Sequence, residues 1–227
     1  MLSDTFRTNN QHHKYKLGDK SLKSSVKEKD LGIIVDDKMK FSEQCSAAVK
    51  KANSTLALIR RTIKYKKKEI IVRLYKALVR PQLEYCIQTW RPYLQTDIDR
   101  LEQVQRRATR MIKECRSQDY ENRLLSTGLI SLEARRNRGD LIQVFNLVKG
   151  IDKIDFNNFF TLANSNRTRG HKYKLVKVRS RLEIRKNFFS NRIVNMWNNL
   201  PAFVVDADSV NSFKNRLDKF WQEARKI

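Results

Sequence analysis

The feature that most constrains the fold is the helical spacing of apolar residues in the segment 96–113. At about 100° of rotation per residue, one face of a helix collects Ile98, Leu101, Val104, Ala108, Met111 and Ile112. The opposite face collects the cations Arg100, Arg106, Arg107, Arg110 and Lys113. Thr96, with Asp99 three residues later, predicts a capping-box start. One face is therefore expected to pack and the other to present cations, which suits a phosphate-facing surface.

Three further helices are predicted before this segment. Ser42 is the expected N-cap of the first. Its apolar seam is Cys45, Val49, Ala52, Leu56, Ile59 and Ile63. The second helix has the apolar positions Ile71, Leu74, Tyr75 and Leu78. It is expected to stop at Arg80, because a proline disfavours helical geometry in the residue before it. Pro81 then opens the third helix, over 82–90, and Pro92 closes it.

The next segment also favours helices. A short one is expected from Asp119 or Tyr120 to Gly128, and Ser131 caps a long one that ends at Gly150. The residues expected to be buried in the long helix are Leu132, Leu141, Val144, Phe145 and Val148. The arginines expected to remain available there are Arg135, Arg136 and Arg138.

The last third of the chain mixes irregular and helical patterns. Residues 151–167 predict an irregular stretch with a Phe159-Phe160 anchor, and 172–179 alternates basic and apolar residues, as in an edge strand or an extended arm. A helix is expected over 188–198, with an apolar face formed by Phe189, Ile193 and Trp197. Ser209 is expected to cap the final helix.

The N-terminal region predicts short strands. Residues 15–22 indicate a hairpin around Gly18-Asp19, and 31–35 indicates a buried strand that ends at a turn. This is too little sheet to stand alone. The expected fold class is therefore mainly α, a helical bundle with a small β element. The expected regions are 1–40 for the β element, 41–150 for the bundle and 151–227 for a basic helical C-terminal region.

The charge of the chain is strongly positive. It has 48 Lys and Arg against 24 Asp and Glu, a net charge of +24 over 227 residues. Such an excess destabilises a compact fold unless a polyanion relieves it. Nucleic acid is the usual partner of a basic intracellular domain. A merely soluble surface is the alternative; an anionic membrane surface fits less well, because the cations are spread over many helices.

Metal and targeting signals are missing from the sequence. The cysteines, Cys45, Cys86 and Cys115, are widely spaced, and no CxxC pair or zinc spacing with the histidines occurs. No phosphate-binding glycine loop or GxSxG motif occurs, so neither a metal, a cofactor nor a catalytic residue is predicted. The N-terminus has no apolar signal region and no stretch of about 18 apolar residues exists. We expect an intracellular protein, in the nucleus, the cytoplasm or both, that does not span a membrane.

Several phrases together resemble one family. They are DLGIIVDDKMKF (30–41), LYKALVRPQLEYCIQTWRP (74–92), LEQVQRRATRMI (101–112), DLIQVFNLVKG (140–150) and WNNLP (197–201). In these segments the chain resembles the C-terminal part of reverse transcriptases from non-LTR retrotransposons, of the LINE type (jockey or CR1-like). The resemblance runs from about Tyr15 to about Trp221. It implies that 1–40 is a remnant of the palm strands and that the helical region is thumb-like.

The resemblance implies nucleic-acid binding without polymerisation. In that family the thumb holds template RNA and the RNA–DNA hybrid by the backbone, and the catalytic aspartates lie in a part of the palm that this sequence does not contain. The cations expected to contact RNA, RNA–DNA hybrid or DNA on the helices are Lys50, Lys51, Arg60, Arg61, Lys76, Arg106, Arg107, Arg110 and Lys113. The expected contacts in the basic RTRGHK segment are Arg167, Arg169, His171 and Lys172.

Two rival functions remain open. Asp36 and Asp37 look like a metal-binding pair, but the residue two positions before Asp36 is Ile34 where the family has an aromatic, which favours a structural turn. A metal-dependent nuclease would need these two to converge with Asp97 and Asp99. The second rival is an interaction module that docks onto an intact reverse transcriptase or onto itself through exposed apolar faces. The run 64–68 fits a nuclear-import signal, a phosphate contact or a solvated linker.

Overall fold

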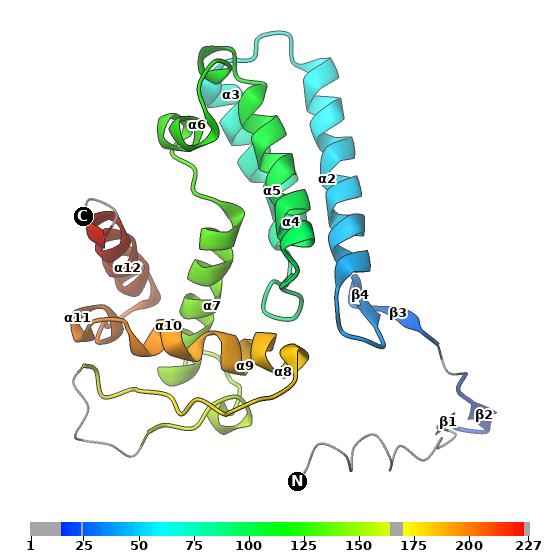
Figure 1. The fold of residues 1–227 in the computed structure, drawn as a ribbon, viewed down its shortest axis with the longest axis vertical. Helices are drawn as coiled ribbons and strands as arrows, with labels where there is room; N and C mark the ends of the chain where they lie inside the picture. The colour runs from blue at the N-terminus through cyan, green and yellow to red at the C-terminus, as the bar shows by residue number, and fades with distance from the viewer. Residues whose placement is uncertain (1–14, 24, 164–169, 225–227) are drawn as a thin grey trace.

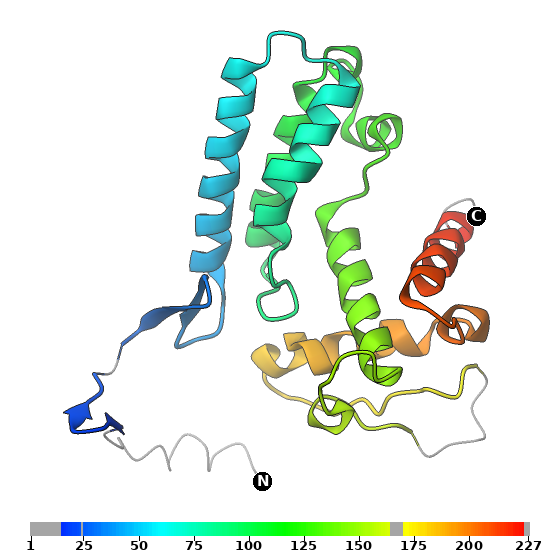
Figure 2. The same cartoon turned by 180° about the vertical axis from the view of Figure 1, so that it is seen from behind.

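The computed structural model describes residues 15–23, 25–163 and 170–224. Its fold is mainly helical, with two small antiparallel strand pairs near the N-terminus, so the predicted fold class is confirmed. Figure 1 shows a bundle of long helices beside a second group of shorter helices, and Figure 2 shows the same arrangement from behind. The two strand pairs lead into the first long helix and lie to one side of the bundle.

The strands form two separate hairpins. Their bounds are β1 Lys16–Leu17, β2 Lys20–Ser21, β3 Lys27–Asp30 and β4 Ile33–Asp36. β1 pairs with β2 around Gly18, as predicted, and Gly18 has a φ of 58°. The predicted strand 31–35 is partly wrong, because Leu31 and Gly32 form the turn between β3 and β4, both with positive φ. Of the second hairpin, Ile33 is buried against the helices.

The bundle is an antiparallel arrangement of long helices. Its elements are α2 Ser42–Thr62, α3 Lys68–Leu74, η1 Tyr75–Val79, α4 Arg80–Glu84 and α5 Gln95–Arg110. α2 and α5 run in the same direction, and the continuous helix α3–η1–α4 runs opposite to both (Figure 1). The predicted apolar faces are confirmed for α2 and α5: Cys45, Ala52 and Leu56 are buried, as are Leu101, Val104 and Ala108.

The first of these helices begins at Ser42, as predicted, but the caps predicted for α2 and α5 are wrong. Phe41, with a φ of 59°, precedes the first turn of α2, and no side chain caps it. Ser42 Oγ instead donates to Asp97 Oδ2 at 2.6 Å. α5 begins one residue before Thr96, so Thr96 lies inside the helix and forms no capping box. The hydrogen bond between the Ser42 hydroxyl and the Asp97 carboxylate therefore joins the starts of α2 and α5.

The predicted break at Pro81 is also wrong. η1 is a π-helical turn, and the helix continues through Pro81 to Glu84. A proline removes a backbone donor and crowds the preceding turn, and a wider π turn relieves that crowding. Gln82 Nε2 donates to the Leu78 carbonyl at 2.7 Å, which satisfies an acceptor at this turn. The wider turn places Val79 in the core and leaves Leu78 exposed, the reverse of the prediction for Leu78.

The next helices have the predicted caps. Their bounds are η2 Lys113–Cys115, α6 Tyr120–Thr127 and α7 Leu132–Val148. Asp119 accepts from the Asn122 backbone N–H at 2.8 Å, and Ser131 accepts from the Ala134 backbone N–H at 3.2 Å. Gly128 ends α6 with a φ of 61°. These confirmed caps follow the local preference of short polar side chains for helix starts.

The arginines of α7 were expected to be available for contacts, but all three are engaged within the protein. Arg135 forms a two-pronged ion pair with Glu84, and Arg138 forms one with Asp218. Arg136 is buried and donates to the Leu83 carbonyl at 3.0 Å. Because α7 lies between the bundle and the C-terminal helices, cations on its polar side meet partners from both.

Several short helices and the longer α12 make up the C-terminal part. Their bounds are η3 Phe156–Asn158, α8 Glu183–Asn187, α9 Phe189–Arg192, α10 Val194–Asn198, α11 Ala202–Val205 and α12 Val210–Ala224. The helix predicted over 188–198 is two short helices, and its apolar residues are buried as expected. The segment 172–179 contributes one isolated bridge, between Leu162 and Leu175. Ser209 Oγ accepts from the Ser212 backbone N–H, which confirms the predicted cap.

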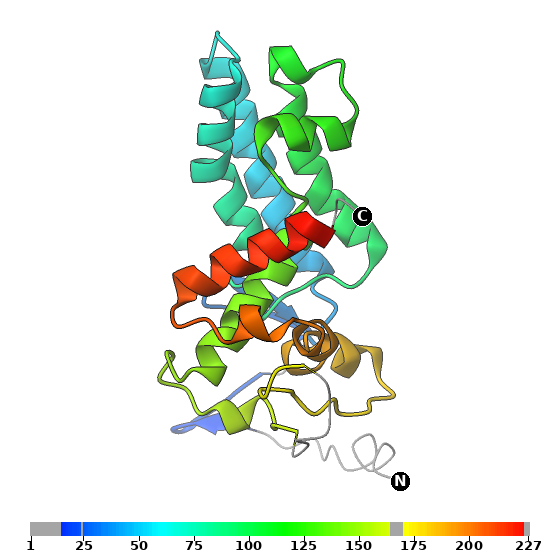
Figure 3. The same cartoon turned by 90° about the vertical axis from the view of Figure 1, so that its left-hand side faces the viewer.

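Buried residues form two cores that meet along α7. The first extends from Ile33 through the bundle to Leu132 at the start of α7. The second begins at Leu141 in the same helix and includes Trp197 and Phe213. Figure 3 shows α12 crossing the side of α7, where Phe213 stacks on Phe145 with ring centroids 4.4 Å apart. One helix therefore supplies apolar residues to both cores.

Candidate nucleic-acid interface

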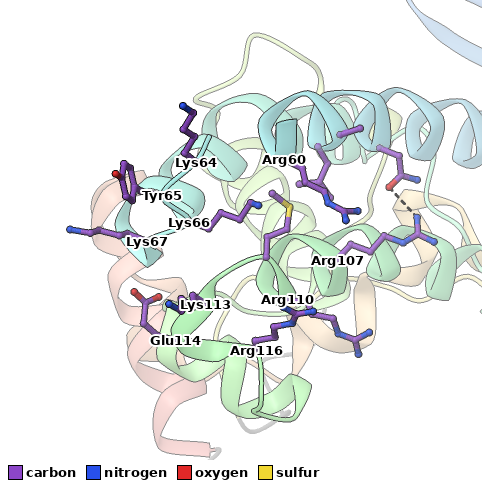
Figure 4. A pocket seen from close by; sticks show the side chains of 14 residues that line it. Arg60, Lys64, Tyr65, Lys66, Lys67, Arg107, Arg110, Lys113, Glu114 and Arg116 are labelled. Atoms are coloured by element: carbon purple, nitrogen blue, oxygen red, sulfur yellow. Dashed lines mark hydrogen bonds between the residues drawn. The ribbon is translucent and has the colours of Figure 1, made fainter. Parts of the chain in front are cut away.

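A groove of about 840 Å³ opens at the end of the bundle where α2 and α5 terminate. Its sides are the last turns of these two helices, the connection 63–67 and the segment 113–116. Figure 4 shows cationic side chains from all of them around the opening. We call this the basic groove, and its cations are Arg60, Lys64, Lys66, Lys67, Arg107, Arg110, Lys113 and Arg116. Glu114 is the one acidic residue among the described residues that line it.

The groove has two basic sides and a partly apolar base. Lys64, Lys66 and Lys67 come from the α2–α3 connection, and the cations of α5 and η2 lie across the opening from them (Figure 4). The backbone N–H of Lys113 donates to the Lys66 carbonyl at 3.4 Å, which joins the two sides. Apolar lining comes from Leu56, Ala57 and Met111. The groove is thus built on packed elements.

Helix ends explain part of this charge. The carbonyl end of a helix carries partial negative charge, and a cation in the last turn stabilises it by about 0.3–1 kcal/mol. Arg60 and Arg61 occupy the last turn of α2, and Arg107 and Arg110 the last turn of α5. The lysines of the α2–α3 connection and Arg116 lie beyond both helix ends, so this stabilisation does not account for them.

The groove cations have no acidic partners in the described residues. The cations that do form ion pairs are Lys27, Arg80, Arg91, Arg100, Arg135, Arg138, Lys186 and Arg192. None of them lines the groove. Within the groove, Arg107 Nη1 donates to the neutral Asn53 Oδ1 at 3.1 Å. The positive charge of the groove is therefore not balanced by ion pairs within the part of the chain that the structure describes.

The structure gathers four of the predicted contact residues and separates the others. Arg60, Arg107, Arg110 and Lys113 line the groove. The exposed cations that do not line it are Lys50, Lys51, Arg61, Arg106 and Lys76. Arg106 lies over the Tyr120 ring, 4.2 Å from its centroid. Lys76 lines a separate hollow of about 550 Å³ between α3 and α6.

The prediction for His171 is wrong. Its side chain is 3% exposed and its Nε2 lies 3.1 Å from the Trp197 carbonyl oxygen. Burial lowers the pKa of His171 below its ordinary value. The sequence placed His171 in a cationic run, but its ring packs edge-on against Trp197. Lys172 is exposed, with its ammonium 5.2 Å from the Tyr173 ring. Arg167 and Arg169 lie outside the described residues.

Other groove residues were missed or left open. Arg116 was not predicted as a contact residue. For Lys64, Lys66 and Lys67, a phosphate contact was one of three interpretations of the run 64–68. Helical periodicity could not find them, because they lie in a connection and after a helix end. The usable signal was their place in the chain: both segments follow amphipathic helices that end in arginines.

The carboxylates proposed for a nuclease do not form a metal site. Asp36 accepts the backbone N–H groups of Lys38, Lys40 and Phe41 at 3.0–3.1 Å, which confirms the structural turn. Asp97 is buried between Ser42 Oγ and Arg100. Among the described residues, no group of three or more His, Cys, Asp or Glu side chains is placed to hold a metal ion.

Within the described ranges, no helix combines the length and the hydropathy that crossing a bilayer requires.

Comparison of the chain with protein-family models, with curated proteins and with solved structures finds no match in any of the three. The functional proposal for this chain therefore depends on the cations that line the basic groove.

Proposed function

We propose that this chain binds nucleic acid through the basic groove, contacting the sugar-phosphate backbone of RNA, RNA–DNA hybrid or DNA. The observation that carries the proposal is the convergence on one groove of eight cations without acidic partners in the described residues, from four segments of the chain. Charged residues scattered at random over a soluble surface have no reason to converge in this way. A polyanion supplies the missing negative charge.

Contacts of this kind position a strand without reading its sequence. Lysine and arginine bound to phosphates release counterions, so the logarithm of the affinity falls linearly with the logarithm of the salt concentration. Four neutralised phosphates on a single strand correspond to a slope of about −3. The partly apolar base of the groove, with Leu56 and Met111, fits a sugar edge better than a phosphate.

The resemblance to the thumb of a non-LTR reverse transcriptase supports the same proposal from the sequence. In that reading the groove holds template RNA or hybrid, and the chain extends no primer by itself. Magnesium and nucleotides added to a primed template test this second part directly. Extension of the primer by purified chain would contradict it.

The decisive test is a charge reversal inside the groove. The double variant Arg107→Glu, Arg110→Glu should bind labelled RNA roughly tenfold or more weakly and show a smaller salt slope. Its matched control is Lys153→Glu, Lys219→Glu, which changes the net charge equally at exposed positions outside the groove. Equal losses in the two variants would reduce the effect to net charge and remove the groove from the proposal.

A second candidate function has its own observation. The N-terminal hairpins expose four apolar side chains, which are Leu17, Leu22, Val26 and Leu31. Exposed apolar surface of this kind favours association with another protein or a second copy. Light scattering over a concentration series tests it: self-association that Leu22→Ser, Val26→Ser abolishes would support an interaction module, and a monomer at all concentrations would exclude self-docking.

A further inference from the structure

One aromatic ring stands at the basic groove without a structural role in either core. Tyr65 is 76% exposed and is the aromatic residue among the described residues that line the groove. Two other exposed rings have protein neighbours: the Tyr85 hydroxyl donates to the Leu31 carbonyl, and Phe188 lies beside the Arg185 guanidinium. An exposed ring gains little from packing, so the fold does not explain why Tyr65 is aromatic.

The backbone on both sides of Tyr65 is fixed. Ile63 packs partly against the first core and its N–H bonds to the Ile59 carbonyl at 3.0 Å. Two residues of the connection after Tyr65 accept hydrogen bonds: Lys66 from Lys113, and Lys67 from the Ile71 N–H at 3.1 Å. The ring is therefore presented from an anchored segment. Ordering it for a ligand costs less than ordering a free loop.

Cations flank this ring: in Figure 4 Lys64 lies above it and Lys67 below it. Lys64, Lys66 and Lys67 are its sequence neighbours, and Lys113 lies near them on η2 (Figure 4). A strand whose phosphates contact these ammonium groups brings its bases within reach of the same segment. An aromatic ring beside phosphate-binding cations is the combination that single-stranded nucleic acid requires, because each unpaired base has a free face to stack.

From this placement we infer that the basic groove takes an unpaired strand, with one base stacked on the Tyr65 ring and the neighbouring phosphates held by the groove cations. The inference rests on the proposed function and narrows its ligand. A fully paired duplex keeps its bases stacked on each other, so it uses the cations but not the ring. The groove therefore distinguishes a single strand, or the unpaired end of a duplex, from continuous duplex.

The test compares three probes at one salt concentration, by fluorescence anisotropy. They are a short single strand of thymidines, the same strand with abasic sugars, and a blunt duplex with the same number of phosphates per strand. We expect the thymidine strand to bind wild-type protein more tightly than the abasic strand. Tyr65→Leu should weaken binding of the thymidine strand between about 5-fold and about 100-fold. Binding of the abasic strand and of the duplex should stay unchanged.

Two controls separate the ring from other effects. Tyr65→Phe keeps the aromatic face and should retain the preference for the thymidine strand. Phe203→Leu removes another exposed ring, on α11, away from the groove, and should change nothing. If Tyr65→Leu leaves all three affinities unchanged, or lowers them equally, the stacking inference is overturned while backbone binding stands. If wild-type protein binds none of the probes, the proposed function fails as well.

Discussion

Asp140 and Arg192 form a buried, two-pronged ion pair, with Nε 2.9 Å from Oδ2 and Nη2 3.0 Å from Oδ1. Arg91 Nη1 donates to the same Oδ2 at 3.1 Å. Arg192 Nη2 also lies 3.2 Å from the Ile87 carbonyl oxygen and 3.3 Å from that of Gln88. One carboxylate on α7 therefore joins α9 to the connection between α4 and α5, and so joins the C-terminal helices to the bundle.

Neutralising this carboxylate should be severe. Asp140→Asn leaves Arg192 without a counter-charge and leaves Arg91 with Glu133 alone, 4.0 Å away. Losing one partner of a buried pair costs about 3–5 kcal/mol. Urea unfolding measures the loss of unfolding free energy. The matched control is Asp218→Asn, which breaks the more exposed pair with Arg138 and should cost about 1 kcal/mol or less. Similar losses in both variants would contradict the structural role assigned to Asp140.

A buried hydroxyl should matter in the first core. Tyr75 Oη donates to Gln105 Oε1 at 2.8 Å, while Gln105 Nε2 donates to the Ile130 carbonyl at 3.0 Å. Tyr75→Phe leaves Gln105 Oε1 buried without a donor, at a cost of about 1–3 kcal/mol. Tyr85→Phe removes an exposed hydrogen bond and serves as the control. A Tyr75→Phe protein as stable as wild type would show that water replaces the lost donor.

The three cysteines should differ in reactivity. Burial, with the nearby Asp97 carboxylate, raises the pKa of the Cys45 thiol to about 12, so the nucleophilic thiolate does not form near neutral pH. Cys115 is buried as well, and Cys86 is exposed. Iodoacetamide should therefore label Cys86 in the native protein and all three in urea, as mass spectrometry would show. Native labelling of Cys45 at the rate of Cys86 would disprove this order.

His171 should make stability depend on pH. Burial, helped by the nearby Lys174 charge, lowers the pKa of His171 in the folded protein, while the unfolded chain takes up its proton near pH 6.5. Below that pH the unfolded state binds more protons than the folded state, so the free energy of unfolding falls as the pH falls. At high pH the effect is absent.

The variant His171→Gln isolates this contribution, because the amide donates a hydrogen bond and does not titrate. Thermal melting at about pH 7 and about pH 5 should show a larger drop for wild type than for the variant. Equal drops would assign the acid sensitivity to titratable groups other than His171.

The sequence predicted helix faces well because they depend on local periodicity alone. The apolar stripes of α2 and α5 and the caps at Asp119, Ser131 and Ser209 needed no knowledge of distant contacts. Pro81 needed such knowledge. Its local preference predicts a break, yet burial of Tyr75 and Leu83 on the same side of one continuous helix outweighs that preference and is reconciled with it by a π turn.

Charged residues show the same limit at the functional surface. Periodicity places arginines on the polar side of a helix, but it does not reveal whether another element later covers that side. Another element covers Arg136 of α7, which is buried, but none covers Arg110 of α5, which faces the groove. The place of Tyr65 at the groove could not be predicted from periodicity either, because Tyr65 lies in a connection between two helices.

The position of α7 limits how this chain can be divided. Leu132 at one end belongs to the first core, and Leu141, Val144 and Phe145 further along belong to the second. A chain ending just after α7 would leave those three side chains in water, and a chain ending just before α7 would deprive the bundle of the cover that Leu132 gives. The two halves therefore share α7, and removing either half would expose apolar residues of the other.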